Sequence, residues 1–271
     1  MAASAPASQG SIYFVGTATT IIRFGGLTLL TDPNFLHKGQ RAYLGRGLSS
    51  RRRTQPALSV EELPELDAVV LSHLHGDHFD RVARRGLDKS LPVLTTRHAA
   101  RHLRLQGFGQ AVPMKTWQAE TLTRGSTSVR VTSLPGRHTN GPLRQVLPPV
   151  MGSLLEFETR PGEVAFRLYI TGDTLVYPDL AEIRSRHPEI DLALLHLGGT
   201  RILGKLVTMD AAQGIELLEL IRPRAAVPIH YDDYPVFKSP LADFQALAAR
   251  GALPTSLSYL SHGESLPIRA G

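Results

Sequence analysis

One short segment of the chain, Ser72–His78, concentrates side chains that bind metal ions. Its sequence is SHLHGDH, with three imidazoles and one carboxylate, and it directly follows the apolar run Asp67–Leu71. Neutral imidazole nitrogen and carboxylate oxygen are good ligands for zinc and related divalent ions. We interpret the segment as a metal site at the end of a strand, with metal-dependent hydrolysis as its chemistry. The alternative is a solvated loop that happens to be rich in histidine, and the specific spacing argues against it.

More ligand-type residues occur farther along the chain, each just after an apolar segment with the character of a strand. They are His138, Asp173 and His230, which follow residues 129–134, 168–172 and 225–229. Strand ends that share a sheet edge, or two facing edges, can bring such side chains together and hold them rigidly. The sequence therefore predicts one site built from the early cluster and these three residues. For Asp173 alone, a turn-forming role is the alternative.

Other residues of the same types have simpler interpretations. Asp32 also follows a predicted strand, but Pro33 comes next, so we expect a turn or a role supporting the ligands. His196 follows a strand and is expected to support the ligands or to line the pocket. His98 and His102 lie four apart on a predicted helix, where an amphipathic helix with exposed histidines is the simpler interpretation.

Three connections are candidates for the pocket wall: residues 141–151, residues 198–208 and the segment that begins at Tyr231. Tyr231 stands next to His230 and could donate a hydrogen bond to a developing oxyanion or leaving group, which makes it a candidate catalytic residue. Arg201 and Lys205 could pair with a phosphate or carboxylate of the substrate. Each of these segments is also consistent with an ordinary surface loop.

Composition narrows the class of protein. With 271 residues and 42% hydrophobic side chains, the chain can bury a large core. It has no cysteine, which excludes disulfides, thiolate ligands and a cysteine nucleophile, so any metal must be held by His, Asp or Glu. The first ten residues lack the features of a secretory signal and no run reaches transmembrane length, so we expect a cytoplasmic protein.

The net charge of +6 comes with clusters of arginine at residues 51–53 and 81–85. Such clusters can bind phosphates or nucleic acid. Aromatic residues make up only 6% of the chain and none is interleaved with these arginines, so we favour a solvated basic face over a nucleic-acid groove. The expected partner is a small molecule, and an anionic one is compatible with this charge.

The pattern of apolar residues predicts the elements that must position the site. Alternating or continuous apolar runs predict strands, and a 3.6-residue period with capping residues predicts helices. The predicted strands are residues 11–15, 20–24, 27–30, 67–71, 93–95, 129–134, 154–158, 165–170, 192–195 and 225–229, and the predicted helices are residues 97–106, 178–185 and a helix from Asp210 to the residue before Pro223.

This order predicts an α/β protein. The chain opens with an antiparallel meander, residues 36–63 form a long surface excursion, and strands and helices alternate afterwards. We expect residues 1–10 to be flexible and residues 11–271 to form one domain. Its two similar halves would join near Gly141–Gly152 and form a pseudo-symmetric sandwich of two sheets with helices outside.

The motif His73-x-His75-x-Asp77-His78, followed by His138, Asp173 and His230, resembles that of the metallo-β-lactamase-fold hydrolases. The resemblance covers nearly the whole chain, from the opening meander and Thr31–Pro33 to Pro228–Tyr231. Within that superfamily it is most similar to the branch of L-ascorbate-6-phosphate lactonase and the N-acylphosphatidylethanolamine-hydrolysing phospholipase D. The resemblance implies a four-layer αβ/βα sandwich and a centre with two metal ions.

The resemblance also implies roles for the residues. One ion would be held by His73, His75 and His138, the other by Asp77, His78 and His230, with Asp173 between them. A shared carboxylate and a shared hydroxide offset the repulsion of two nearby cations, and a metal-bound water with a pKa lowered to about 7 supplies a nucleophile near neutral pH.

The leading hypothesis is a binuclear hydrolase in which a metal-bridging hydroxide cleaves a small ester, lactone, amide or phosphodiester. Zinc is the expected metal, and manganese or iron suits the same ligands. Two alternatives stay open: a nuclease or phosphodiesterase that acts on RNA or DNA, and a mononuclear iron oxidoreductase or non-catalytic metal-binding protein on the same scaffold.

Overall fold

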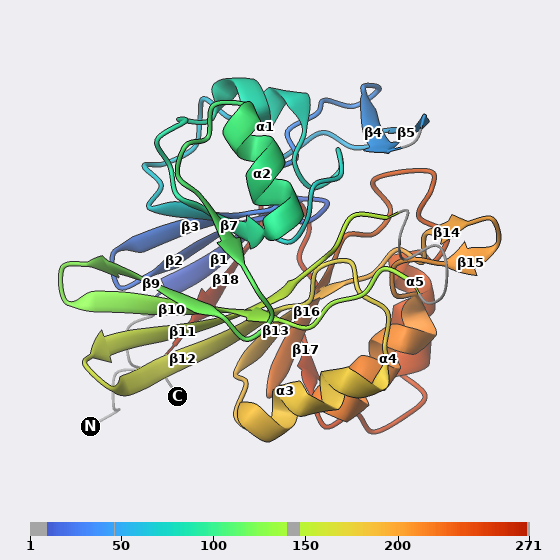
Figure 1. The fold of residues 1–271 in the computed structure, drawn as a ribbon. Helices are drawn as coiled ribbons and strands as arrows, with labels where there is room; N and C mark the ends of the chain where they lie inside the picture. Colours follow the sequence, from blue (N-terminus) through green and yellow to red (C-terminus); the bar gives the residue numbers. More distant parts are fainter. Residues whose placement is uncertain (1–9, 46, 140–146, 270–271) are drawn as a thin grey trace.

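In the computed structural model, which describes residues 10–45, 47–139 and 147–269, two seven-stranded sheets pack face to face (Figure 1). The first sheet contains, in spatial order, β18 (Ser265–Ile268), β1 (Gly10–Gly16), β2 (Thr19–Phe24), β3 (Leu27–Thr31), β6 (Ala68–Leu71), β7 (Val93–Thr96) and β8 (Ala111–Met114). The second contains β17 (Ser256–Leu257), β16 (Ala225–Ile229), β13 (Leu192–His196), β12 (Glu163–Ile170), β11 (Gly152–Arg160), β10 (Thr127–Leu134) and β9 (Ala119–Arg124).

Both sheets follow the same plan, which is the predicted pseudo-symmetry. Strands β1 to β3 are antiparallel, and β3, β6, β7 and β8 then run parallel. In the second sheet β9 to β12 are antiparallel, and β12, β13, β16 and β17 run parallel. Because parallel strands end at the same edge of a sheet, the loops after them gather in one place.

Helices cover the two outer faces and complete four layers (Figure 1). The first sheet carries α1 (Arg81–Gly86) and α2 (Arg97–Leu105); the second carries η2 (Pro178–Leu180), α3 (Ala181–Arg186), α4 (Ala211–Ile221) and α5 (Leu241–Ala248). The predicted cap of α4 is present, since the Asp210 side chain accepts a hydrogen bond from the Gln213 amide at 3.1 Å. The four-layer α/β sandwich is confirmed. Among the described helices, none has the length and apolar character needed to cross a membrane.

The main core lies between the two sheets and draws on both of them. Phe24 of the first sheet packs on Phe157 and Phe166 of the second, with ring centroids 4.8 and 5.9 Å apart. Two further apolar clusters fill the spaces between each sheet and its helices. The sheets are therefore joined by a continuous apolar layer, which makes the positions of their edges rigid.

Two small hairpins stand outside the sheets, at the edge where the loops gather. One is β4 (Arg41–Gly45) with β5 (Leu48–Arg51), and the other is β14 (Arg201–Ile202) with β15 (Lys205–Leu206). The first lies within residues 36–63, the predicted surface excursion, where no strand was predicted. The two strands of this hairpin were not predicted, because exposed residues and glycines interrupt the alternation of apolar and polar residues there.

Two other expectations are corrected. The chain passes from the first sheet to the second between β8 and β9, at residues 115–118, and not near Gly141–Gly152; the predicted strand 129–134 is β10 and belongs to the second sheet. Gly10, assigned to a flexible terminus, is the first residue of β1. The remainder of that terminus, and residues 140–146 of the expected junction, lie outside the described residues.

Candidate metal centre

The candidate ligands come from loops that leave the ends of strands, as the sequence predicted. Residues 72–78 follow β6, His138 follows β10, Asp173 follows β12, and His230 follows β16. The Gly172 turn shows how tightly these loops meet. This residue has a φ of +61°, and a Cβ there would lie 2.7 Å from the Met151 carbonyl oxygen and 3.0 Å from the Ser72 Cβ, so only glycine fits.

The seven predicted ligands converge on one point. Possible ligand atoms of His73, His75 and His138 lie within 4.8 Å of one another, and the same is true of Asp77, His78 and His230. Asp173 sits between the two groups. Its carboxylate lies 3.3 Å from His78 Nε2 and 3.5 Å from His230 Nδ1, and it also forms a group of the same kind with His73 and His78.

Several imidazoles of the cluster form a hydrogen bond through one ring nitrogen, which leaves the other nitrogen available to bind a metal ion. His138 Nδ1 donates to the Val207 carbonyl at 3.0 Å, and His230 Nδ1 donates to the Leu197 carbonyl at 2.9 Å. The Nε2 atoms of both rings are buried and make no hydrogen bond. The same is true of His78 Nε2, Asp77 Oδ1 and Asp173 Oδ1. Buried polar atoms without partners are costly, and ring nitrogens fixed in this way are characteristic of metal ligands. The donor set therefore fits one or more divalent ions.

Asp32 lies behind the cluster and supports it. Its carboxylate accepts hydrogen bonds from the Ser72 amide at 2.7 Å, the Ser72 hydroxyl at 2.9 Å, His78 Nδ1 at 3.1 Å and His196 Nε2 at 3.3 Å. Burial would raise the pKa of Asp32, but the charges and hydrogen bonds of His78 and His196 outweigh burial and lower it to about 2. Asp32 is thus ionised and orients His78, as the sequence interpretation of a supporting role expected.

The two groups of ligands differ in electrostatics. Burial, reinforced by neighbouring imidazoles, lowers the pKa of His73 and lowers that of His75 to about 3. Burial also lowers the pKa of His138, so all three rings are neutral at neutral pH, the form that binds metals. For His78 and His230, burial again favours the neutral ring, but the facing carboxylates, chiefly Asp173, outweigh it and raise the pKa. That side of the site therefore attracts positive charge.

A cleft of about 290 Å³ opens in front of the cluster and is lined by His75, Asp77, His138 and Asp173. Its remaining described walls are mostly apolar. They come from both small hairpins and from the loops before α4 and after β16: Leu44, Leu48, Ile202, Leu203, Val207 and Val236. The cleft is the place where a substrate would reach the ligands.

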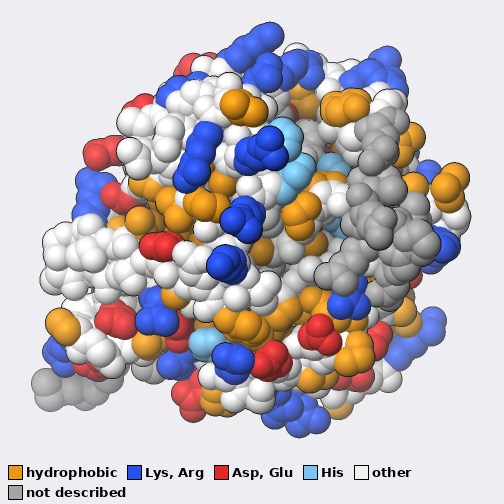
Figure 2. Space-filling model, in the orientation of Figure 1, with side chains coloured by type: hydrophobic (Ala, Val, Ile, Leu, Met, Phe, Trp, Pro, Cys, Tyr) orange, Lys and Arg blue, Asp and Glu red, His pale blue; other side chains and the backbone are white. Residues whose placement is uncertain are grey.

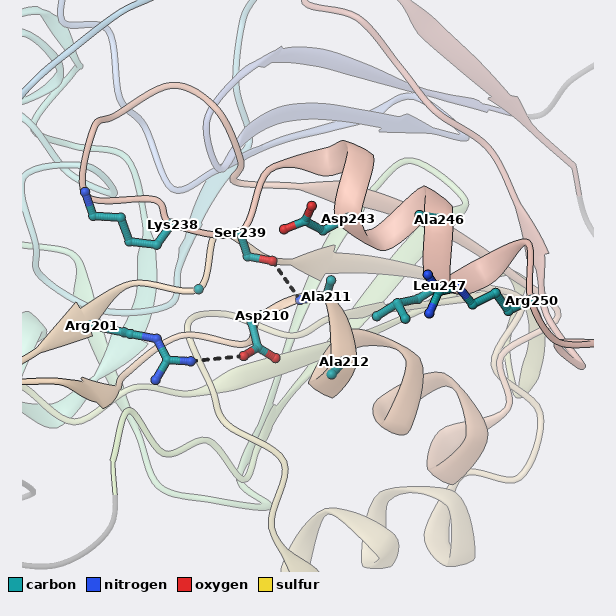
Figure 3. A pocket seen from close by; sticks show the side chains of 11 residues that line it. Arg201, Asp210, Ala211, Ala212, Lys238, Ser239, Asp243, Ala246, Leu247 and Arg250 are labelled. Atoms are coloured by element: carbon teal, nitrogen blue, oxygen red, sulfur yellow. Dashed lines mark hydrogen bonds and ion pairs between the residues drawn. The ribbon is translucent and has the colours of Figure 1, made fainter.

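Of the four predicted substrate residues, only Arg201 is among the described residues that line the cleft. Arg201 lines the cleft, but its guanidinium lies 3.5 Å from the Asp210 carboxylate in a neighbouring hollow between α4 and α5 (Figure 3). Lys205 is exposed and is not among the cleft's described lining residues. Tyr231 is absent from that lining as well, and its hydroxyl donates to the Leu260 carbonyl at 3.2 Å. His196 is fully buried against Asp32.

These positions correct two predictions. Lys205 and Tyr231 are not among the described residues that line the cleft, so the structure gives no basis for a substrate or catalytic role for them. His196 does not line the cleft either, but its contact with Asp32 agrees with the first of its two expected roles, support of the ligands. For Tyr231 and Lys205, the reason is that neighbours of a cleft residue along a turn can point to the opposite side. The predicted wall at residues 141–151 lies partly outside the described residues.

One part of the site's support was missed in the sequence. Arg52, expected on a solvated basic face, is 1% exposed and lies 4.0 Å from Asp233. It also donates to the backbone carbonyl of Asn34 at 2.9 Å and to its side chain at 2.6 Å. Arg52 thus ties the segment after β3 to the loop after His230. Its neighbours Arg51 and Arg53 are exposed, and nothing in the run of three arginines distinguishes the buried one from them, so no sequence signal marks it.

The remaining arginines of the two predicted clusters are at the surface. Arg51 and Arg53 are exposed, and so are Arg81, Arg84 and Arg85 of α1. Figure 2 shows basic side chains spread over the upper part of that face, with histidine side chains visible in a hollow between them. This arrangement agrees with a solvated basic face.

Comparison with known proteins gives the same fold and a reaction class. Residues 28–231 match the family model of the β-lactamase superfamily domain. A UPF0173 metal-dependent hydrolase of Deinococcus radiodurans is 31% identical over 205 residues, which are 74% of this chain and 80% of that protein.

Two solved structures have the same fold over nearly their whole length. An isothiocyanate hydrolase from Delia radicum gut bacteria aligns with a TM-score of 0.81 and 20% identity, covering 96% of this chain and 100% of that one. A possible metal-dependent hydrolase from Veillonella parvula aligns with a TM-score of 0.77 and 21% identity, covering 97% and 100%.

Proposed function

The chain belongs to the β-lactamase superfamily and is a metal-dependent hydrolase, and from this premise we propose that it uses two divalent ions to hydrolyse a small ester, lactone, amide or phosphodiester. The observation that carries the proposal is the convergence of seven His and Asp side chains, five of which present a buried atom or ring nitrogen without a hydrogen-bond partner. Zinc is the proposed metal because the donors are nitrogen and oxygen with histidine predominant, and manganese or iron is the alternative.

The geometry supports a division into two sets of ligands. His73, His75 and His138 would hold one ion, and Asp77, His78 and His230 would hold the other. Asp173 would be shared, since its carboxylate lies 3.3 Å from His78 of the second set and also groups with His73 of the first. A carboxylate shared by two cations reduces their mutual repulsion, and this is the reason to assign Asp173 to both ions.

When bound, the ions would activate water as a nucleophile and polarise the oxygen of the scissile bond. Asp77 and Asp173 line the cleft, and each has a carboxylate oxygen available to accept a hydrogen bond from the attacking water. Opposing effects act on both groups. Burial raises the pKa of each, but the surrounding histidines outweigh burial and lower it, so both carboxylates stay ionised and can accept a hydrogen bond at the cleft. Thr208 donates to Asp173 at 3.0 Å and fixes its orientation.

The test combines metal analysis with substitution of one ligand of the first set, His75, and of the shared ligand, Asp173. We expect close to two ions per chain in the wild type, fewer in His75→Ala and Asp173→Ala, and no measurable hydrolysis by either variant. His102→Ala is the matched control, because this exposed histidine of α2 lies outside the ligand groups and should leave both measurements unchanged. Full activity in a metal-free preparation would refute the mechanism. One iron per chain with oxygen consumption would indicate an oxidoreductase instead.

The reaction class is tested with a panel of small electrophiles. The panel contains 4-nitrophenyl butyrate, a γ-lactone, an anilide, bis-4-nitrophenyl phosphate and benzyl isothiocyanate. The isothiocyanate is included because a protein of this fold is an isothiocyanate hydrolase, and its hydrolysis would release the amine and carbonyl sulfide. We expect at least one member to be hydrolysed in a metal-dependent manner, and inactivity toward all five would contradict the proposed range of substrates.

A further inference from the structure

The cleft in front of the metal centre has walls whose chemistry indicates what it accepts. Its volume of about 290 Å³ lies at the lower end of the range of ligand pockets, roughly 300–1,000 Å³, so the substrate is small. Leu44 and Leu48 form one side and Ile202 and Leu203 another. Each pair belongs to one of the two small hairpins, so both hairpins present leucine or isoleucine to the same space.

The tips of these hairpins expose apolar side chains to an unusual degree. The large hydrophobic side chains that are exposed among the described residues are Tyr43, Leu48, Leu105, Leu203 and Tyr259, and three of these five are on the two hairpins. Leu48 is 49% exposed and Leu203 is 89% exposed. Apolar surface left in water at the rim of a cleft contributes nothing to folding and marks a binding site.

The backbone at Leu203 strengthens this argument. Leu203 and Gly204 form the two-residue turn of the β14–β15 hairpin, with φ values of 50° and 78°. Turns of this kind strongly prefer Asn-Gly or Asp-Gly, because a left-handed conformation is strained for other residues. A leucine at this position is therefore unfavourable both for the backbone and for solvation. Contact between Leu203 and a bound ligand explains why leucine is present at this position.

The described residues around the cleft carry little charge that would favour an anionic substrate. Arg201 is the only cationic side chain in the described lining, and its guanidinium is engaged by the Asp210 carboxylate at 3.5 Å and the Gly204 carbonyl at 3.3 Å. Figure 3 shows this side chain directed toward Asp210 at the start of α4. Lys205 does not belong to the described lining. The one cationic side chain in the described lining is thus paired with a carboxylate and directed away from the metal ligands toward α4.

We propose that the substrate is an uncharged small molecule with an apolar group that packs between Leu48 and Leu203 while its scissile bond lies at the metal ligands. This inference rests on the proposed function, because it assumes that the cleft leads to a metal centre that binds the reacting group. It differs from the option, left open by the sequence, that Arg201 or Lys205 pairs with a phosphate or carboxylate of the substrate.

The test measures binding of three hydroxamic acids to the zinc-loaded full-length protein by titration calorimetry. Hydroxamates chelate metal ions through two oxygens, so all three probes anchor at the same place. Acetohydroxamic acid has a minimal tail, hexanohydroxamic acid has an apolar tail, and the monohydroxamate of adipic acid has a tail of the same length that ends in a carboxylate. We expect hexanohydroxamic acid to bind at least about tenfold more tightly than either of the others, which corresponds to burial of roughly two methylene groups.

The variant Leu48→Ser/Leu203→Asn removes both apolar side chains. Asparagine tolerates the left-handed turn at position 203, so this variant should fold and keep its metal content. We expect the tenfold preference for the apolar tail to fall to about twofold or less. Leu105→Ser is the matched control, since this leucine is 81% exposed on α2 and does not line the cleft; the preference should persist.

The outcomes separate the inference from the proposed function. If no hydroxamate binds the zinc-loaded protein, the metal centre itself is wrong and the inference falls with it. If all three bind with similar affinity, or the carboxylate tail binds most tightly, the metal centre stands and the inference is overturned. The same conclusion holds if Leu105→Ser reduces the preference as much as the double variant does.

Discussion

At the scale of single residues, the property that distinguishes this site is the fixed orientation of its imidazoles. His78, His138 and His230 each donate from Nδ1 to an acceptor that is itself part of the fold, which directs Nε2 into the cluster. Two of the acceptors are backbone carbonyls and cannot be removed by mutation. The third is Asp32, whose φ of 35° places a non-glycine residue in the left-handed region. Such strain is kept where the surrounding structure requires it.

Asp32→Asn tests this orientation. The substitution preserves the shape of the side chain and removes the charge that holds His78 Nδ1, so we expect affinity for zinc to fall about 10- to 100-fold. The measurement is competition with a chromogenic chelator, and KM measured at saturating zinc should be nearly unchanged. Asp88→Asn, at an exposed turn, is the control and should have no effect. Equal affinities for wild type and Asp32→Asn would contradict the supporting role.

At the scale of elements, the loops that carry the ligands are held by a buried polar network as well as by the sheets. Arg52, just after β5, contacts Asn34 and Asp233, and Asp233 also accepts hydrogen bonds from the Thr17 amide and the Thr54 hydroxyl. His230, whose amide donates to the Thr17 carbonyl at 2.7 Å, is connected to the same network. The network joins the segment after β3, the β1–β2 turn and the loop after β16.

Arg52→Met should be strongly destabilising, because it removes the arginine charge beside the buried Asp233 carboxylate and leaves two Asn34 oxygens without their arginine donor. We expect the free energy of unfolding to decrease by about 3–5 kcal/mol, measured by urea denaturation. Arg51→Met, one residue earlier and exposed, should change it by no more than about 0.5 kcal/mol. A similar small change in both variants would show that the network is not a structural requirement.

Asp233 also predicts a pH dependence of stability. Burial raises the pKa of this carboxyl, but the hydrogen bond and charge of His262, with Arg52 and Thr54, outweigh burial and lower it. A group whose pKa is lowered in the folded state stabilises the protein fully above its unfolded pKa of about 3.9 and loses that contribution as pH falls through the lower folded value. We expect Asp233→Asn to be less stable than wild type at neutral pH, and the difference to shrink below about pH 4. Urea midpoints with EDTA present measure both proteins, and a difference that grows in acid would contradict the assignment.

At the scale of the whole molecule, the two sheets depend on each other because they share one core. Phe24 comes from the first sheet and contacts Phe157 and Phe166 of the second, so neither sheet can retain its apolar face without the other. On this ground we propose that the two sheets belong to one domain, as expected from the sequence for residues 11–271. It also means that the loops with the candidate ligands, which come from both sheets, are positioned by a single packed unit.

Phe24→Ala should therefore weaken the whole fold and not only the first sheet. We expect a loss of about 3–5 kcal/mol, with the whole chain still unfolding in one transition. The single tryptophan, Trp117, packs against the outer core of the second sheet, so its fluorescence reports on that half while far-ultraviolet circular dichroism reports on both. Coincident midpoints are the expected result. Loss of circular dichroism ahead of the fluorescence change would instead show two separately folding halves.

Much of the molecule was predictable from local patterns, because apolar periodicity and turn residues act over a few neighbours. The strands at residues 67–71 and 225–229 and the helix capped by Asp210 were predicted within a few residues of where they lie. The short hairpins were missed because exposed leucines and glycines do not alternate. The change of sheet at residues 115–118 was missed because hydrogen bonding between strands, and not strand identity, decides which sheet a strand joins.

The sequence by itself determined the donor types, their spacing in Ser72–His78 and the rule that ligands follow strands, since these depend on covalent order and local geometry. Only the tertiary structure decided that Arg52 is buried beside Asp233, that Tyr231 turns to Leu260 and that Arg201 pairs with Asp210. Those outcomes depend on contacts between residues far apart in the chain, and side chains of the same type differ there only in what surrounds them. The apolar character of the cleft belongs to the same class, because leucines from two separate hairpins acquire a common role only where the fold places them around one space.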